Sequence, residues 1–559
     1  MPTLQFKGKT AIECYHHTVQ HHTLEFDEKL SVLGKGEKPG LDGNLIIEGD
    51  NLQALKALLP THAGKIKCVY IDPPYNTGNE AWVYNDNLTQ PQFKEWIGQT
   101  VGKEGEDATR NDKWCCMMYP RLQLLREMLR DNGAIFVSID DNEVQHLRML
   151  MDEVFGTENF VACVCWQKKY SASNDHQGIA PMHDFLLVYQ KSSEFKRNLL
   201  PRTAQQDRAY KNPDNDPRGP WKPADYTCNK TKDERPNLYY AIQNPYKGQD
   251  VWPDDKRVWA YSEDVTELNV ENKLLWWGKD GANSVPALKN LLRDVQGGLV
   301  PTTWWAQEDV GHTDEAKKEV QRIIGMAATS ITPKPVDLLR RVLRIAASSD
   351  DLVLDSFAGS GTTAHAALEL NKEDAGKRKF ILIQMPFDTK KQEDDRFNIC
   401  ENITAERVRR VCKGYSYTTQ KGKKVGVEGL GGSFTYARVG VPLFGEYRDM
   451  GKKLPAYEEL AKYIFYTETS RDFDRKAMNE KSGKIGDYNG TSYYLLYTPN
   501  SNEDRALDLD WLRAIGKGEK NHNLVVYCEK IWVHRDDLAM CEMETKRRVR
   551  PMLVPFNLK

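Results

Sequence analysis

A short segment, Asp72-Pro73-Pro74-Tyr75, follows the apolar run 69–71 and carries residue types that suit an amine substrate. Proline has no N–H to donate and forces the residue before it into extended backbone, so we expect a buried strand to end at Asp72. In the loop that follows, the Asp72 carboxylate and the Pro73 carbonyl can each accept one N–H of a planar exocyclic amine. The Tyr75 ring can stack on the ring that carries this amine. Because Asp-Pro pairs are also common in surface turns, the segment alone leaves a turn and a site open.

A glycine-rich loop in the second half of the chain is the other candidate. An apolar strand, 351–355, is expected to run into it, and a helix is expected to begin at its end. Glycines there permit a tight turn and a close approach of the backbone to a ligand. The loop lacks the Gly-Lys-Ser/Thr ending of a phosphate-binding P-loop, so the chain shows no obvious ATPase signature. We call it the glycine loop, and it consists of Phe357, Ala358, Gly359, Ser360, Gly361 and Thr362.

Both candidates follow predicted strands of one α/β domain. Short apolar runs alternate with stretches whose leucines recur every three to four residues, which is typical of a mostly parallel sheet covered by helices. Ligands of such sheets bind beyond the carboxyl ends of the strands, so both segments are expected at one edge, with Asp50 at a neighbouring strand end. Residues 80–113 are predicted to be a polar loop, and 120–130 a helix that Asp131-Asn132-Gly133 terminates. The predicted strands are 45–47, 69–72, 134–139, 160–166, 184–190, 351–355 and 380–384.

Residues 191–325 differ in composition from the segments on either side. Residues 191–247 hold 12 Lys and Arg against 7 Asp and Glu, and tyrosines and tryptophans are interleaved with them. This mixture suits phosphate contact and base stacking, although the tryptophans of a small β-rich insert also form its core. We expect the tryptophan pairs 276–277 and 304–305 to pack inside, and the Lys and Arg of 191–235 to face DNA.

Bulk composition limits the function classes. The 559 residues suggest three to four domains, and a net charge of −2 means that any nucleic-acid surface must be locally basic. The eleven cysteines form no C-x-x-C pair and the N-terminus shows no secretory signal, so we expect reduced thiols in a cytoplasmic protein without a membrane span. Four histidines, at 16, 17, 21 and 22, have the density of a metal site, but no well-placed carboxylate pair lies near them in sequence. A packed or solvated helix is therefore expected there, and no metal.

The two motifs together resemble the S-adenosylmethionine-dependent amino-methyltransferases of DNA. In that family the glycine loop holds the methionine part of the cofactor, and D-P-P-Y holds the target amine. The order found here, with the basic insert between the motifs, resembles the β class, in which the insert is the target recognition domain. Thr332-Pro333-Lys334-Pro335 is similar to the family's element beside the cofactor. The resemblance implies catalytic roles for Asp72, Pro73, Pro74 and Tyr75. It implies cofactor contacts for Asp50, Pro333, Lys334, Asp355, Phe357, Ala358, Gly359, Ser360, Gly361, Thr362 and Gln384.

Two of these cofactor positions are ambiguous. Asp355 fits a structural role at the strand end as well as it fits a cofactor contact. Gln384 stands where the family often has an acid that holds the ribose hydroxyls. A glutamine can still hydrogen-bond a hydroxyl, but Gln384 supports a ribose contact less strongly than an acid at this position would.

A closer resemblance joins residues 44–414 to the modification (Mod) subunit of Type III restriction-modification systems. The segments that carry it are 44–55, 64–79, 276–281 and 297–305. It implies a doubly wound, mostly parallel, seven-stranded Rossmann-like methyltransferase sheet with an inserted recognition domain and a C-terminal α+β region. It also implies double-stranded DNA as a partner, a homodimer, and a separate helicase–nuclease restriction subunit. The expected domains are an N-terminal extension (1–43), a first core part (44–190), the recognition domain (191–325), a second core part (326–414) and a C-terminal domain for assembly (415–559).

The predicted activity is transfer of a methyl group from S-adenosylmethionine to adenine N6 in duplex DNA, after the base leaves the stack. The chain contains no Pro-Cys pair, which argues against cytosine-C5 chemistry, where a thiolate attacks the ring. The aspartate in D-P-P-Y favours adenine N6 over cytosine N4. The alternatives are a cytosine-N4 methyltransferase, methylation of RNA or of another planar amine, and a catalytically inactive DNA-binding or assembly subunit.

Overall fold

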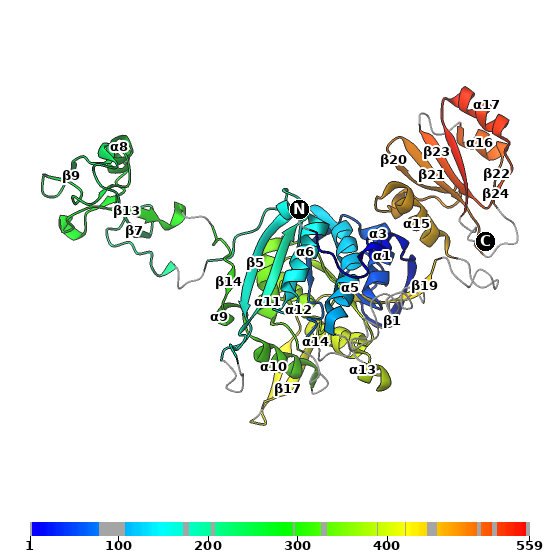
Figure 1. Ribbon diagram of the computed structural model, residues 1–559, viewed down its shortest axis with the longest axis horizontal. Helices are drawn as coiled ribbons and strands as arrows, with labels where there is room; N and C mark the ends of the chain where they lie inside the picture. Colours follow the sequence, from blue (N-terminus) through cyan, green and yellow to red (C-terminus); the bar gives the residue numbers. More distant parts are fainter. Residues whose placement is uncertain are drawn as a thin grey trace. The chain divides into compact units, whose positions relative to one another are not determined.

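The computed structural model of the chain forms two compact units, of which the smaller is residues 199–301 and the larger is the rest of the chain (Figure 1). Each unit has its own core and is described by itself. The described residues are 3–77, 107–171, 178–202, 207–294, 297–325, 332–387, 390–419, 421–443, 455–499, 505–516 and 522–554.

A ten-stranded mixed sheet is the framework of the larger unit. Its strands are β1 (His22–Val32), β2 (Leu45–Glu48), β3 (Ile66–Ile71), β4 (Leu129–Ile139), β5 (Phe160–Gln167), β6 (His183–Gln190), β14 (Trp304–Trp305), β15 (Leu352–Asp355), β16 (Lys379–Gln384) and β19 (Phe434–Pro442). They lie in the order β1-β19-β2-β16-β15-β3-β4-β6-β5-β14. From β19 to β4 every pairing is parallel, whereas β6 is antiparallel to both β4 and β5. All residues of β3 are buried, as expected for a parallel strand covered on both faces.

Seven strands were predicted, and seven of the ten come from segments 44–190 and 326–414. The other three extend the sheet at its edges, which makes the predicted count too low. β19 pairs in parallel with β2, and β1 pairs with β19 in turn. Without β19, the backbone N–H and C=O groups on the outer side of β2 would lack partners in the sheet. Part of the N-terminal extension and the start of the predicted C-terminal domain therefore belong to the ten-stranded sheet.

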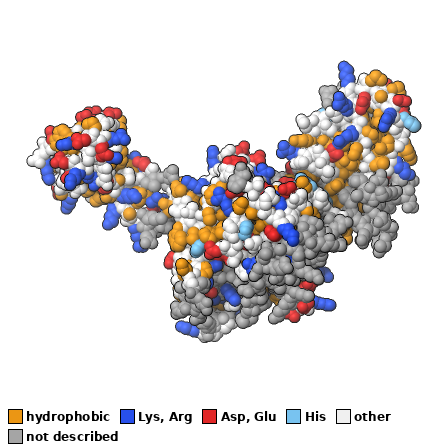
Figure 2. Space-filling view, in the orientation of Figure 1, with side chains coloured by type: hydrophobic (Ala, Val, Ile, Leu, Met, Phe, Trp, Pro, Cys, Tyr) orange, Lys and Arg blue, Asp and Glu red, His pale blue; other side chains and the backbone are white. Residues whose placement is uncertain are grey.

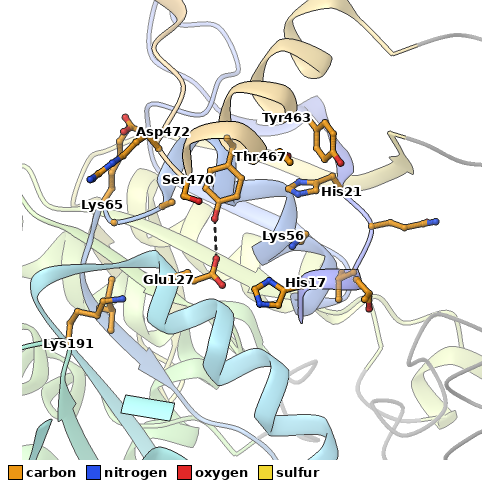
Figure 3. A pocket seen from close by; sticks show the side chains of 18 of the residues that line it. His17, His21, Lys56, Lys65, Glu127, Lys191, Tyr463, Thr467, Ser470 and Asp472 are labelled. Carbon is orange, nitrogen blue, oxygen red and sulfur yellow. Dashed lines mark hydrogen bonds and ion pairs between the residues drawn. The ribbon is translucent and has the colours of Figure 1, made fainter. Parts of the chain in front are cut away.

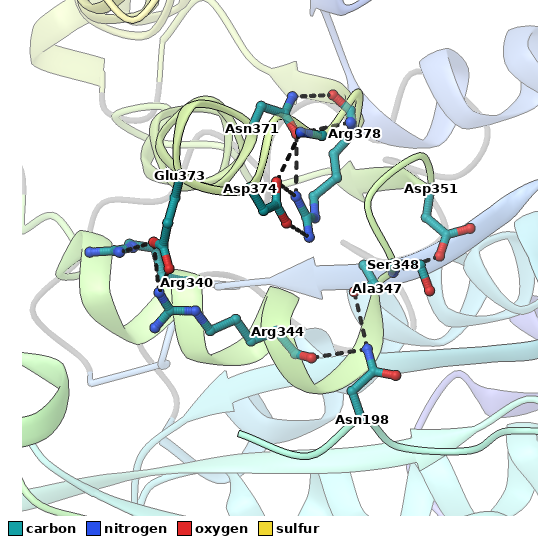
Figure 4. A network of polar contacts seen from close by, with 11 residues as sticks. Asn198, Arg340, Arg344, Ala347, Ser348, Asp351, Asn371, Glu373, Asp374 and Arg378 are labelled. Atoms are coloured by element: carbon teal, nitrogen blue, oxygen red, sulfur yellow. Dashed lines mark hydrogen bonds and ion pairs between the residues drawn. The ribbon is translucent and has the colours of Figure 1, made fainter. Parts of the chain in front are cut away.

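Helices cover the sheet on both faces (Figure 1). On one face α3, α5 and α6 share a core with alternate residues of β3 and β4. α11 packs against α12, and their polar sides are joined by Glu373, which accepts hydrogen bonds from Arg340 and Arg344 (Figure 4). In the same figure Asn198 donates to the carbonyls of Arg344 and Ala347, which fixes the chain just before the smaller unit begins. The helix bounds are α3 (Asn51–His62), α5 (Asp107–Met128), α6 (Val144–Phe155), α11 (Val336–Ala346), α12 (Thr362–Asp374) and α14 (Glu406–Lys413).

The structure corrects the prediction for α5. The helix begins at Asp107 rather than at Pro120, it ends at Met128, and β4 starts at the next residue, so the predicted break at 131–133 is absent. A proline inside a helix costs about 3 kcal/mol. The buried side chains ahead of it, Trp114 and Met118 among them, each contribute stabilisation of a similar size, about 1.5–3 kcal/mol. Of the predicted loop 80–113, residues 80–106 lie outside the described part of the chain.

The smaller unit has short strands around an aromatic core. Its largest sheet contains β7 (Trp221–Asp225), β12 (Leu275–Trp276) and β13 (Ala287–Leu291). Of the pair 276–277 that was expected to pack inside, Trp277 is buried and Trp276 is partly buried. Trp259 is buried as well, while Trp252 is half exposed. Figure 2 shows basic and acidic side chains interspersed on the visible face of this unit. The buried aromatic and aliphatic core consists of Tyr226, Tyr240, Ile242, Trp259 and Trp277.

A four-stranded sheet forms the C-terminal part of the larger unit. Helix α15 (Tyr457–Thr469) packs on one face of it, and two hydrophobic cores lie on its two sides. Its strands are β20 (Lys484–Tyr488), β21 (Thr491–Leu496), β23 (Asn523–Cys528) and β25 (Val549–Leu553). Among the helices of the described ranges, none combines the length and the apolar character that a membrane crossing requires.

The pair Trp304–Trp305 offers a matched test of the sheet edge. Trp305 is 1% exposed and its Nε1 donates to the Thr302 carbonyl at 2.8 Å, whereas Trp304 is 59% exposed, contrary to the expectation that both pack. Trp305→Ala is expected to lower the free energy of unfolding by about 3–5 kcal/mol, because it leaves a cavity beside β5. Trp304→Ala is expected to change it by less than about 1 kcal/mol. Urea titration followed by circular dichroism measures both, and equal effects would contradict the burial pattern.

Candidate active site

The two predicted segments follow neighbouring strands. β15 and β3 pair in parallel, with Val353 opposite Cys68 and Leu354 opposite Val69. From β3 the chain continues outward to β4, and from β15 it continues outward in the other direction to β16. Such a reversal of strand order opens a crevice at the carboxyl ends, where ligands of doubly wound sheets bind. The D-P-P-Y segment and the glycine loop therefore lie on the two sides of one crevice.

Lys334 connects the two sides. Its Nζ donates to both carboxylate oxygens of Asp72, at 2.7 and 2.6 Å, and lies 5.0 Å from the centroid of the Tyr75 ring. Its own carbonyl accepts a hydrogen bond from Thr362 Oγ1 at the end of the glycine loop. The sequence predicted Lys334 beside the cofactor loop, and the structure adds a charged contact to the candidate catalytic acid.

The D-P-P-Y loop is fixed by contacts that the sequence did not indicate. Trp114 Nε1 donates to the Pro74 carbonyl at 2.7 Å. Asn76, with a φ of 60°, is buried and donates through Nδ2 to Glu143 and to Asn111. Burial raises the pKa of the Glu143 carboxyl, and Asn76 opposes this rise by donating to it. The loop therefore leaves β3 in one defined direction, with the Asp72 carboxylate held toward Lys334.

A second carboxylate lies near Asp72. Asp184, at the start of β6, is almost fully buried and accepts a hydrogen bond from Lys168 Nζ at 2.5 Å. Burial raises the pKa of Asp184, the two lysines Lys334 and Lys168 lower it, and the negative charge of Asp72 raises it further. No sequence motif indicated the pair Lys168–Asp184. Together with Lys334 and Asp72, this pair places two carboxylates beside two lysine ammonium groups on the D-P-P-Y side of the crevice.

Asp355 holds the glycine loop from the strand end. Its Oδ1 accepts from the Phe357 N–H at 3.1 Å and its Oδ2 from Thr363 Oγ1 at 2.5 Å. Burial raises its pKa to about 7. Because both oxygens are engaged by the loop and by α12, these contacts support the structural role that the sequence left open.

The far side of the glycine loop rests on α14 and on the turn before it. Thr404 Oγ1 donates to the Gly359 carbonyl at 2.6 Å. Arg407, which is fully buried, donates through Nη1 to Ser360 Oγ and to Thr362 Oγ1, both at 2.8 Å. No local pattern distinguishes Arg407 from the other arginines of this helix, so the sequence analysis missed it.

Two glycines are required by the backbone of this loop. Gly359 and Gly361 have φ values of 51° and 76°, a region that side chains disfavour. A Cβ at Gly361 would lie 3.3 Å from the Thr404 carbonyl oxygen, so close packing excludes one there. At Gly359 a Cβ would meet only the Phe357 carbonyl oxygen, at 3.9 Å, among the described atoms. Gly359 therefore faces the open side of the loop.

Asp50 and Gln384 are engaged by the protein itself. Asp50 Oδ1 caps α3 by accepting from the N–H groups of Leu52 and Gln53, and its Oδ2 accepts from Arg121 at 3.0 Å. Asn51, the next residue, donates to the Ser356 carbonyl and ties α3 to the glycine loop. Gln384 Oε1 accepts from the Gly359 N–H at 2.7 Å, so the side chain predicted to reach a ribose also supports the loop. Of the other predicted cofactor positions, Pro333, Phe357 and Ala358 are buried.

The comparison with known families agrees with this geometry. A model described as DNA methylase matches residues 66–395, more than half of the chain, and the match includes both motifs. The chain belongs to the DNA methylase family. The match also spans the smaller unit, 199–301, so this unit lies between the two motifs within a family domain.

Relatives of this DNA methylase are of two kinds. The Type III restriction-modification enzyme StyLTI Mod subunit of Salmonella typhimurium is 34% identical over 380 residues, which is 66% of this chain and 57% of that one. The EcoPI Mod subunit of Escherichia phage P1 is 32% identical, over 68% and 64% of the two chains. The Type II methyltransferase M.KpnI of Klebsiella pneumoniae is 33% identical, over 60% and 79%. The alignments thus span about three fifths of the length of the two Mod subunits.

Arg407 provides a test of how the glycine loop is held. Arg407→Lys keeps the charge but removes Nη2, which lies 3.2 Å from His365 Nδ1 and 3.5 Å from Glu319 Oε2, so a buried ammonium is left with fewer partners. We expect the free energy of unfolding to fall by about 3 kcal/mol. Arg410→Lys, three residues on in the same helix and 41% exposed, is the control and should cost less than about 1 kcal/mol. Similar costs for the two variants, measured by urea unfolding, would show that the loop does not depend on Arg407.

Proposed function

We propose that this DNA methylase transfers a methyl group from S-adenosylmethionine to adenine N6 in duplex DNA. The observation that carries the proposal is the placement of D-P-P-Y and the glycine loop on the two sides of one crevice, at the ends of the paired strands β3 and β15. One side offers an acceptor for an amine and the other offers a backbone cradle. Each motif is ambiguous alone, whereas a site that combines them suits group transfer between two bound molecules.

The residues of the glycine loop fit S-adenosylmethionine as cofactor. Gly359 presents open space on its side-chain face, and the loop is held rigid by Asp355, Gln384, Thr404 and Arg407. We assign Phe357–Thr362, with Pro333 and Lys334, to its binding, and Asp50 to the end near its adenine. When bound, the cofactor supplies an electrophilic methyl group on a sulfonium. The protein must therefore bring an amine lone pair to that methyl group and exclude water from it.

The D-P-P-Y segment is proposed to hold the target amine. Adenine N6 cannot be reached in line within the base stack, so the base must swing out of the duplex. Tyr75 would stack on the flipped base, and Asp72 and the Pro73 carbonyl would accept its two N6 hydrogens. These contacts favour a pyramidal nitrogen with its lone pair pointing away from the acceptors. The nitrogen becomes acidic only after alkylation, when Asp72 can accept the proton.

Lys334 is proposed to act as a positioning residue for Asp72. A carboxylate has two oxygens with room for further donors, so the target amine can bond to Asp72 while Lys334 keeps one of its contacts. Lys334 also shares Thr362 with the glycine loop, which couples the position of the acceptor to that of the cofactor cradle. Asp184 and Lys168 complete the charge balance around this contact.

The smaller unit is proposed to be the target recognition domain. It belongs to the basic and aromatic insert between the two motifs, and it keeps large aromatic rings at its surface, with Tyr246 60% and Trp252 51% exposed. The ring centroids of Trp252 and Tyr239 are 5.4 Å apart, and Lys232 Nζ lies 5.8 Å from the centroid of the Tyr239 ring. Cationic and aromatic groups side by side can contact phosphates and stack on bases. We assign these exposed rings to the DNA-binding surface of the unit.

The biological setting is proposed from the names of the relatives. The two Mod subunits belong to Type III restriction-modification enzymes, so we propose that this chain methylates DNA in a similar defence system. A homodimer and a separate helicase–nuclease restriction subunit are the expected partners. The part of the chain beyond β19 is the candidate for these assembly contacts. Cytoplasmic DNA is the proposed substrate.

The first test replaces the candidate catalytic acid. Asp72→Asn removes the anionic acceptor while keeping the shape, and we expect methyl transfer to fall by at least about 100-fold. The measurement uses labelled S-adenosylmethionine with DNA that lacks methylation, followed by digestion to nucleosides. Label in N6-methyladenine nucleoside supports the proposal, label in N4-methylcytosine nucleoside supports the cytosine alternative, and absence of label in the wild type supports an inactive binding subunit. Asp337→Asn, an exposed acid on α11, is the matched control and should retain activity.

The second test separates positioning by Lys334 from a structural role. Lys334→Met is expected to lower kcat by about 10–100-fold, because Asp72 loses the group that orients it. The KM for DNA and the temperature of unfolding should change little, since the side chain is replaced by one of similar size. Lys334→Arg should restore part of kcat, and Lys372→Met, on the exposed side of α12, should behave as wild type. A loss confined to KM, or a large drop in unfolding temperature, would contradict positioning.

A further inference from the structure

A cluster of metal-ligand type lies on the opposite side of the domain from the crevice. His16 and His17 belong to the short helix α2 (Tyr15–Thr18), and Glu127 lies in the last turn of α5. One ligand atom from each of the three residues lies within 4.8 Å of the others. The two imidazole rings are 3.9 Å apart at their centroids, and His16 Nε2 is 3.9 Å from Glu127 Oε1.

The Glu127 carboxylate is the ligand of this cluster that could not be identified from the sequence. The histidine pair alone gave no reason to expect a metal, because no well-placed pair of carboxylates stands near it along the chain. Folding brings Glu127 to it from 110 residues away, by packing α2 against α5. Two imidazoles and one carboxylate form a ligand set that binds Zn²⁺ in proteins, with water in the fourth position. Mg²⁺ and Ca²⁺ prefer ligand sets made entirely of oxygen, so the two histidines disfavour them.

A cavity of about 1060 Å³ adjoins the cluster, and both His17 and Glu127 line it. In Figure 3 these two side chains point toward one another at its wall. The cavity gives access to the cluster and leaves room for a water ligand. Its remaining walls come from the N-terminal segment, from α3 and from α15, with Lys56 and Tyr463 among the lining residues.

Two further features of the cluster concern metal binding, namely a hydrogen bond to Glu127 and the burial of the His16 ring. Tyr466 of α15 donates to Glu127 Oε2 at 3.0 Å, which orients the carboxylate as outer hydrogen bonds do at metal sites (Figure 3). His16 is 94% buried, and its Nδ1 finds no hydrogen-bond partner among the described residues. The nitrogen of this ring that lies 3.9 Å from Glu127 Oε1 is Nε2, so Nε2 is the candidate ligand atom of His16.

We propose that His16, His17 and Glu127 bind a divalent transition-metal ion of the zinc class, with water as the fourth ligand. The ligand atoms lie within 4.8 Å of one another. Bonds from a metal ion to nitrogen are about 2.0–2.1 Å long, so the three side chains need to move only a short distance to surround one ion. The ion would tie the N-terminal extension to α5 and, through Tyr466, to α15. The site is separate from the methyl-transfer crevice, so the proposal holds whether or not the proposed activity is correct.

The test is a zinc titration of the full chain, freed of any affinity tag and stripped with a chelator. Calorimetry of the wild type is expected to show one equivalent of Zn²⁺ bound, and thermal unfolding is expected to shift upward with ZnCl₂ but not with MgCl₂. His17→Ala and Glu127→Gln should each weaken binding by at least about tenfold, and Tyr466→Phe by up to about tenfold. His22→Ala is the control from the same segment, because that ring bonds to the Gly440 carbonyl instead, and it should bind zinc as the wild type does.

Cobalt absorption keeps the test decisive if a variant is less stable. Co²⁺ bound to nitrogen and oxygen ligands gives a visible spectrum, which should be present in the wild type and in His22→Ala and lost in His17→Ala. His17 is exposed, so its replacement leaves the core intact. Zinc binding that persists unchanged in His17→Ala and Glu127→Gln would place the ion on other groups, such as the free thiols, and would overturn the proposal. Absence of zinc binding by the wild type would overturn it as well.

Discussion

The short parallel pairing of β15 with β3 is the constraint on which the rest of the structure depends. Only two residue pairs join these strands, yet they bring together segments almost 300 residues apart in the chain. Each strand ends in a loop of fixed shape, one stiffened by prolines and the other by bonded glycines. Because the pairing is parallel and in register, both loops leave the sheet at the same edge. A change of register by one residue would turn the strand side chains to opposite faces and separate the loops.

Charge is the second organising feature of the crevice. Burial raises the pKa of Asp184 and of Asp355, and the neighbouring lysines oppose that rise. The negative charge of Asp72 raises the pKa of both Asp184 and Asp355, Lys334 lowers the pKa of both, and Lys168 lowers that of Asp184. The pairing of Lys334 with Asp72 joins the two halves of the crevice by charge, as the strand pairing joins them by backbone. Both connections are needed if one molecule is to be held against another.

Local chemistry explains how much could be predicted from the sequence. The ends of β3 and β15 were predicted because proline and glycine act on their own backbone, within one or two residues. Trp114, Arg407 and the pair Lys168–Asp184 were missed because their roles arise only from tertiary contacts. The start of α5 was misplaced because Pro120 is a strong local signal that burial of the preceding side chains overrides. Of the three additional strands, β14 was missed because it has only two residues, and β1 and β19 because their burial does not alternate along the strand.

The most direct measurement of the central claim is modified-base sequencing of DNA from a methylation-free host that expresses this chain alone. If D-P-P-Y and the glycine loop form one site for an adenine amine, N6-methyladenine should appear, confined to one short sequence context that the smaller unit selects. Absence of any modified base would show that the crevice does not transfer methyl groups by itself. Modification at cytosine N4 instead would show that the same geometry serves a different amine.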